Sequence, residues 1–219
     1  MSLSDTDSFI DEVTEEVRRD RLFALMRKYG WIGIVAVLGI VGGAAYNEWQ
    51  KARAEAEAQA FGDSVMSAME AEDRAAALAA VSADGARAGV LALIAAAETE
   101  ATDAEGRAAA LEKLSAVASD TEVPQSLRDL ARLKSVIVGG AAMDAATRDA
   151  SLAALAAPGA PYRLLAMEQQ ALVHVAEGRT DAAVDLLRQI LSEAGLTAGL
   201  QQRASELIVA LGADPAAQN

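Results

Sequence analysis

The stretch between Lys28 and Glu48 contains no charged residue, and this constrains the chain more than any other feature. Read as an α-helix at roughly 1.5 Å per residue, residues 29–47 extend about 28 Å, close to the roughly 30 Å hydrocarbon core of a bilayer. Aromatic rings favour the membrane–water interface. Those at the two ends of the stretch are therefore predicted interface anchors: Tyr29, Trp31, Tyr46 and Trp49. The sequence predicts one transmembrane helix at residues 29–47.

Two other interpretations of this apolar stretch remain open. One is the buried core helix of a soluble protein, which would leave the flanking aromatic residues without explanation. The other is a cleaved signal peptide, because Gly43-Ala44-Ala45 resembles a cleavage site. The segment before it, however, is about 30 residues long and rich in Asp and Glu, and both properties are atypical of a signal peptide.

Positive charge is distributed unevenly around the stretch. The basic residues before it are Arg18, Arg19, Arg21, Arg27 and Lys28. Within a comparable distance after it come only Lys51 and Arg53. The positive-inside rule then places the N-terminus in the cytoplasm and the residues after about 48 on the far side, which in a bacterium is the periplasm. We therefore predict a single-pass protein of the bacterial inner membrane whose C-terminal domain lies in the periplasm.

The stretch also contains Gly39 and Gly43, which lie about one helical turn apart. Such a small-xxx-small pair permits close approach of another membrane helix, although glycine is common in membrane helices generally. We predict that these glycines pack against a membrane partner. Residues 1–28 form a predicted cytoplasmic amphipathic tail, which is either a solvated or interfacial helix or a docking helix for a cytoplasmic partner.

The predicted fold class is all-α: a single N-terminal transmembrane helix followed by an α-solenoid of degenerate tetratricopeptide-like helix pairs. Alanine, the best helix former, is abundant, aromatic residues make up only 4% of the chain, and strand-type runs are missing outside the anchor. We expect a connecting helix at 48–82, the helical domain at 83–212 and a disordered C-terminus at 213–219. The expected helices of the domain are Asp84–Glu98, Ala104–Ala118, Pro124–Val138, Ala145–Ala156, Pro161–Glu177, Thr180–Ala194 and Leu196–Leu211.

The clearest repeat pattern lies late in the chain. Small residues are expected where the two helices of a pair cross, because bulky side chains would hold the helices apart. Larger apolar residues follow four and seven positions later. The residues predicted to pack within this repeat are Ala171, Gly178, Ala183, Leu187 and Ile190. An earlier copy of the pattern contains Ala110, Leu114 and Val117.

The combined architecture resembles the YfgM-type ancillary SecYEG translocon subunit family. The similar segments are 126–133, 158–163, 177–183 and 200–208. The resemblance implies a non-enzymatic protein of the bacterial inner membrane that associates with the protein-export channel SecYEG and with periplasmic chaperones. It implies no catalytic residues.

Several classes of function are disfavoured by composition. The net charge of −13 argues against a nucleic-acid partner, which needs clustered Lys and Arg. The absence of Cys removes thiolate chemistry, and His174 is the only histidine, so it is interpreted as a core or groove residue rather than a ligand or a base. We therefore expect no enzyme activity, no metal, no cofactor and no small-molecule substrate.

The predicted function is that of a membrane-anchored periplasmic protein–protein interaction module. Its role as a translocon accessory subunit linking SecYEG to periplasmic chaperones is implied by the resemblance. An assembly factor or accessory subunit of another complex, such as a respiratory or cytochrome-maturation machine, remains the alternative. The predicted partner groove, which could also be simple packing between repeats, consists of Tyr162, Arg163, Leu165, Glu168, Leu172 and Val175.

Overall fold

The computed structural model describes residues 4–99 and 103–215, and side chains from Met26 onward. Throughout these residues the regular structure is helical and no strand occurs, which confirms the all-α prediction. The α-helices in chain order are α1 Ser4–Glu70, α2 Arg74–Ala80, α3 Gly85–Ala97, α4 Ala104–Ser119, α5 Gln125–Gly139, α6 Ala145–Leu155, α7 Arg163–Ala176, α8 Thr180–Ser192 and α9 Ala198–Ala210. One 3₁₀ turn, Gly140–Ala142, follows α5.

The chain divides into two separately compact units, residues 1–60 and residues 61–219. The first contains most of α1, including the predicted tail. Residues 1–3 of this tail, and its side chains before Met26, lie outside the described part. The second contains the end of α1 and all later helices. The prediction of a continuous connecting helix at 48–82 is wrong at the C-terminal end, because α1 stops at Glu70. Asp73 then starts α2 by accepting a hydrogen bond of 3.0 Å from the backbone N–H of Ala76.

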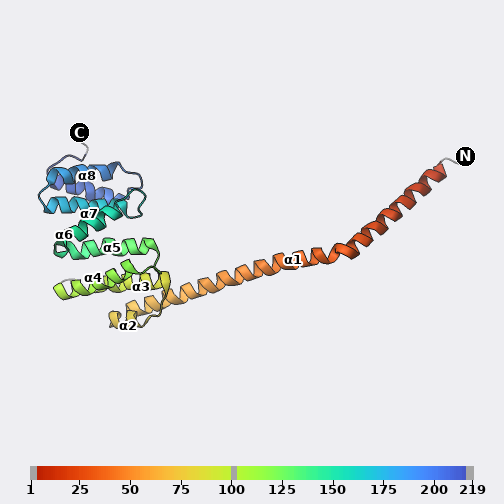
Figure 1. Ribbon diagram of the computed structural model, residues 1–219, viewed down its shortest axis with the longest axis horizontal. Coiled ribbons are helices and arrows are strands. Elements are labelled where there is room, and N and C mark those ends of the chain that lie inside the picture. The colour runs from red at the N-terminus through yellow and green to blue at the C-terminus, as the bar shows by residue number, and fades with distance from the viewer. Residues whose placement is uncertain (1–3, 100–102, 216–219) are drawn as a thin grey trace. The chain divides into compact units, whose positions relative to one another are not determined.

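Within the second unit, each helix from α2 to α9 packs against the next one in the chain, and Figure 1 shows this succession from the yellow α2 to the blue α8. A stack in which each element contacts its neighbours is typical of a solenoid. The expected helix pairs are compatible with it, since α4 packs closely with α5 and α7 with α8.

The hydrophobic core of this unit is a series of four clusters in chain order. Val65 and Ala68 of α1 meet Leu78 of α2 in the first cluster. The second cluster joins α3, α4 and α5, and the third joins α5, α6 and α7. The fourth, which we name the C-terminal cluster, joins α7, α8 and α9 through Met167, Ala171, Val184, Leu187, Ile190, Leu200, Ala204 and Ile208.

Local sequence signals fix the ends of these helices. Asp103, Asp144 and Thr197 cap α4, α6 and α9 by accepting hydrogen bonds from backbone N–H groups of the first turn. After α7 the chain reverses at Gly178, whose φ of +74° belongs to the left-handed region that glycine adopts without steric cost. The short turn brings α8 directly back along α7.

Gly89 shows why a glycine occurs inside α3. A Cβ atom at this position would lie 2.7 Å from Cγ1 of Val123, which precedes α5. Glycine weakens an isolated helix by about 1 kcal/mol relative to alanine. Here its missing side chain lets the second cluster close.

The predicted disorder of residues 213–219 is wrong for the part that the structure describes. The backbone N–H of Ala213 donates to the carbonyl of Ile208 at 3.1 Å, and Ala213 packs against the C-terminal cluster. The Arg188 guanidinium donates to the carbonyl of Asp214 at 3.0 Å. These contacts hold the chain against α8 and α9, whereas residues 216–219 lie outside the described range.

Candidate functional site

The apolar part of α1 is exposed along its whole length. Its most apolar 18-residue stretch has a mean hydropathy of 1.7 and is long and apolar enough to cross a membrane. None of this stretch is buried against any other described part of the chain. The interpretation as a buried core helix would need the stretch to be covered by its own protein, and in the described residues it is not.

Aromatic residues and cations occur together at both ends of this stretch. The ammonium of Lys28 lies 5.5 Å from the ring centroid of Tyr29, and the guanidinium of Arg53 lies 5.8 Å from that of Trp49. The rings of Tyr46 and Trp49 are 6.1 Å apart, and all the predicted anchors, Trp31 included, are exposed. A charged head beside an amphipathic ring suits the boundary between lipid and water.

Gly39 and Gly43 leave an open surface on this segment. A Cβ atom added to either glycine would meet nothing within 4 Å among the described residues. The helix backbone is therefore accessible at both positions, as a close helix–helix contact requires. Their packing against a membrane partner stays a prediction.

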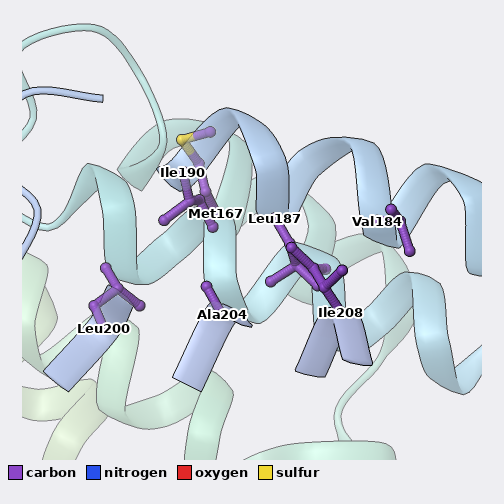
Figure 2. Packing of buried hydrophobic residues seen from close by; sticks show 8 residues of the cluster. Met167, Val184, Leu187, Ile190, Leu200, Ala204 and Ile208 are labelled. Atoms are coloured by element: carbon purple, nitrogen blue, oxygen red, sulfur yellow. The ribbon is translucent and has the colours of Figure 1, made fainter. Parts of the chain in front are cut away.

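Of the residues predicted to pack within the late repeat, four lie together where α7 and α8 cross, whereas Gly178 is exposed in the turn between the two helices. Ala171, Ala183, Leu187 and Ile190 are completely buried, and Figure 2 shows Leu187 and Ile190 of α8 directed toward α7 and α9. The small side chains of the two alanines allow the helices to approach closely. In α4 the earlier copy is equally inaccessible, since Ala110, Leu114 and Val117 are buried.

The predicted partner groove is only partly accessible. Leu165 and Leu172 are exposed on α7, while Tyr162, Arg163 and Val175 are half-buried.

Glu168 was expected to face a partner and does not. It is only 9% exposed, and its carboxylate accepts hydrogen bonds of 2.7 and 2.8 Å from Nε and Nη2 of Arg203. A bidentate pair of this kind is geometrically specific. The pair links α7 to α9, so Glu168 is a structural contact of the stack.

A hollow of about 550 Å³ opens between α6, α7 and α8. We name the apolar residues of its lining the floor: Leu152, Val173, Ala182 and Leu186. The other lining residues are polar, and we name them the rim: Asp149, Gln170, His174, Arg179, Asp185 and Gln189. We name this feature the α6–α8 hollow. It lies on a different face of α7 from the predicted groove, because Gln170 and Leu172 are two positions apart and therefore roughly 200° apart around the helix.

A chain of ion pairs runs along one side of the α6–α8 hollow. Arg148 of α6 donates to Asp149 at 2.9 Å and to Glu177, beyond α7, at 3.1 Å. Glu177 also pairs with Arg179. Arg179 in turn donates from Nε and Nη2 to Nδ1 of His174, at 3.0 and 2.7 Å. The hydrogen bonds that Arg148 donates to Asp149 and to Glu177 raise the pKa of its guanidinium.

Sequence reasoning missed this network and the hollow beside it. Arg148 lies on α6 and Glu177 just beyond the end of α7, and no periodicity indicates that they meet. The one available signal was His174, a polar residue at a position where the repeat pattern often has an aromatic side chain.

The entrance of the predicted groove contains another ion pair. Arg163 donates to Glu193 at 2.8 Å, joining the start of α7 to the end of α8. This hydrogen bond holds the pKa of Glu193 below its usual value. Tyr162 and Leu165 line a second hollow of about 460 Å³ beside this pair.

In the described residues no group of three or more His, Asp or Glu side chains is placed to hold a metal ion. The polar side chains of the α6–α8 hollow are instead an arrangement for hydrogen bonding and charge pairing. No protein-family model, curated protein or solved structure matches this chain.

Proposed function

We propose that this chain is a membrane-anchored interaction protein, in which α1 crosses a bilayer once and the helical stack binds other polypeptides. The observation that supports this most strongly is the fully exposed apolar stretch of α1, followed by a separately compact helical unit. Exposed apolar surface of this extent is unstable in water and marks a membrane or protein interface. Stacked helices with accessible faces are common protein-binding scaffolds.

The proposed orientation has the N-terminus in the cytoplasm and the helical stack in the periplasm. The excess of Arg and Lys before the apolar stretch supports it. Because the chain contains no cysteine, single Cys residues can report the side of the membrane directly. In intact cells a membrane-impermeant maleimide should label Ser115→Cys, on the exposed surface of α4, and should leave Ser8→Cys unlabelled until the cells are opened. The reverse pattern would overturn the orientation.

We further propose that the protein acts beside the protein-export channel SecYEG and that its stack engages periplasmic chaperones. The support is the sequence resemblance in segments 126–133, 158–163, 177–183 and 200–208. Acidic residues outnumber basic ones beyond the anchor, which keeps such a stack soluble and repels it from anionic lipid head groups.

Purification in mild detergent, followed by mass spectrometry, tests this partner. Export-channel subunits should co-purify with the full-length chain, and the Gly39→Ile/Gly43→Ile variant should recover less of them because isoleucine prevents close helix approach. A matched variant, Val35→Ile/Val41→Ile, changes apolar positions of the same helix without filling a glycine surface and should behave as the unaltered chain. Recovery of a respiratory or cytochrome-maturation complex without the channel would replace the proposal.

A further inference from the structure

The α6–α8 hollow has the size and composition of a binding site. Pockets that hold ligands typically measure about 300–1,000 Å³ and combine an apolar lining with a few polar groups. The hollow measures about 550 Å³ and has Val173, Ala182 and Leu186 on its floor. It is therefore large enough for an apolar side chain of a bound peptide and the backbone on either side of it.

Two polar side chains of α7 line the hollow together with residues of α6 and α8. These are Gln170 and His174, which lie one helical turn apart, whereas Ala171 of α7 and Leu187 of α8 are completely buried. An aromatic side chain at position 174, as the repeat pattern often has, would occupy more of this space. The sequence thus leaves an opening where close packing would otherwise be expected.

The positive charge beside the hollow is already used within the protein. Arg179 pairs with Glu177 and donates two hydrogen bonds to Nδ1 of His174. Nδ1 of His174 is thereby already used as an acceptor within the protein. Arg148 is likewise shared between Asp149 and Glu177.

The negative charge beside the hollow is less fully compensated. Asp185 is exposed on α8 and has no ion pair to any described residue. Asp149 is also exposed, and the Arg148 guanidinium that it pairs with is shared with Glu177. The rim therefore complements a cation, and the floor complements an apolar side chain.

We propose that the α6–α8 hollow binds an extended segment of another polypeptide by placing one apolar side chain on the floor and a neighbouring lysine or arginine against Asp185. This inference rests on the proposed function, since it assigns the stack a partner of defined chemistry. It places the binding surface on a face of α7 other than the one that carries Leu165 and Leu172.

Fluorescence anisotropy on the full-length protein in detergent micelles tests the proposal. The probe is a short labelled peptide in which leucine alternates with lysine, and the comparison peptides replace lysine with glutamate or leucine with serine. The first peptide should bind and the other two should bind weakly. Asp185→Lys should reduce its affinity about tenfold or more, because it turns the attraction into like-charge repulsion.

Asp181→Lys is the matched control, because Asp181 is an exposed aspartate one turn earlier on α8 and does not line the hollow. It should change the affinity by less than about twofold. Equal losses in the two variants would show nonspecific charge attraction and overturn the proposal. Ala182→Phe fills the floor without altering charge, and it should also abolish binding while thermal unfolding remains unchanged.

Selective isotope labelling of the histidine ring reports peptide binding directly, because His174 is the only histidine of the chain. Its single NMR signal should shift on addition of the lysine–leucine peptide and should not shift in Ala182→Phe. Concentration-dependent dimerisation that Asp185→Lys removes would identify a second copy of the chain as the occupant and overturn the assignment. If the unaltered protein does not bind the lysine–leucine peptide, while its membrane extraction and partner recovery are as expected, the binding site in the hollow is rejected. The proposed function then stands.

Discussion

The apolar stretch of α1 and the C-terminal cluster use the same kinds of side chain in opposite surroundings. Ile40 in α1 is 73% exposed, whereas Ile190 in α8 is completely buried. Burying one such side chain stabilises a protein by about 1.5–3 kcal/mol. The cluster gains this stabilisation from its own helices, while α1 can gain it only from a bilayer or another protein. Apolar composition alone therefore does not define a core.

Introducing charged residues into the apolar stretch of α1 should have the largest effect, which is on membrane insertion. Leu38→Arg/Ile40→Arg should prevent stable membrane insertion, because each arginine costs about 2.5–3.5 kcal/mol near the centre of a membrane helix. Extraction of membranes with alkaline carbonate should then release the protein. Val209→Arg, at an exposed position of α9, should remain in the pellet. Retention of the double variant in the pellet would contradict insertion through this stretch.

Truncating the C-terminal cluster should have the next largest effect. Leu187→Ala removes a completely buried side chain and should lower the free energy of unfolding of the helical stack by about 2–5 kcal/mol. Pulse proteolysis in urea on the full-length protein in micelles measures this change. The matched variant Val209→Ala, at an exposed site, should stay within about 0.5 kcal/mol. Similar losses in both variants would show that the cluster is not the core of the stack.

The Glu168–Arg203 pair should show an asymmetry between its partners. The Glu168 side chain is 11% exposed and that of Arg203 54% exposed, so Arg203→Met leaves a nearly buried carboxylate without its partner. We expect a loss of about 1–3 kcal/mol in the free energy of unfolding. Adding Glu168→Leu should recover part of it, because no unpaired charge then remains. A double variant less stable than Arg203→Met would refute this account.

Acid should weaken the stack through the Arg163–Glu193 pair, which is the smallest of these effects. The pKa of Glu193 lies below its ordinary value of 4.5 because Arg163 donates a hydrogen bond to the ionised carboxylate. The stabilisation is therefore present above pH 4.5 and is lost as the pH falls through the lower, folded-state pKa. Thermal unfolding midpoints of Arg163→Gln should fall less steeply over this acidic range than those of the unaltered protein. Parallel curves would contradict the contribution of the pair.

Much of the fold was predictable because its signals are local. Breaks at glycine and proline residues, together with apolar periodicity, predicted α3 to α9 to within a few residues. The repeat pattern also placed Ala171, Ala183 and Leu187 together, since small residues at a helix crossing are a steric requirement. The break after Glu70 was missed because the surrounding alanine-rich sequence favours a helix on both sides of it.

The candidate site was less predictable because it depends on contacts between distant residues. The direction of Glu168 toward Arg203 follows from how α9 packs on α7, and helical periodicity on α7 alone does not contain that information. The α6–α8 hollow likewise depends on Asp149, His174 and Asp185 from three helices. Only tertiary packing brings these groups together.

The division of the core into clusters that each join successive helices has a consequence for motion. Opening one end of such a stack disturbs one cluster and leaves the others closed, so the helices should open in sequence from the ends. Amide hydrogens of α9, at one end of the series, should then exchange with solvent sooner than those of α5, which belongs to two clusters. A protein built this way can release a terminal helix to a partner while most of its backbone stays protected.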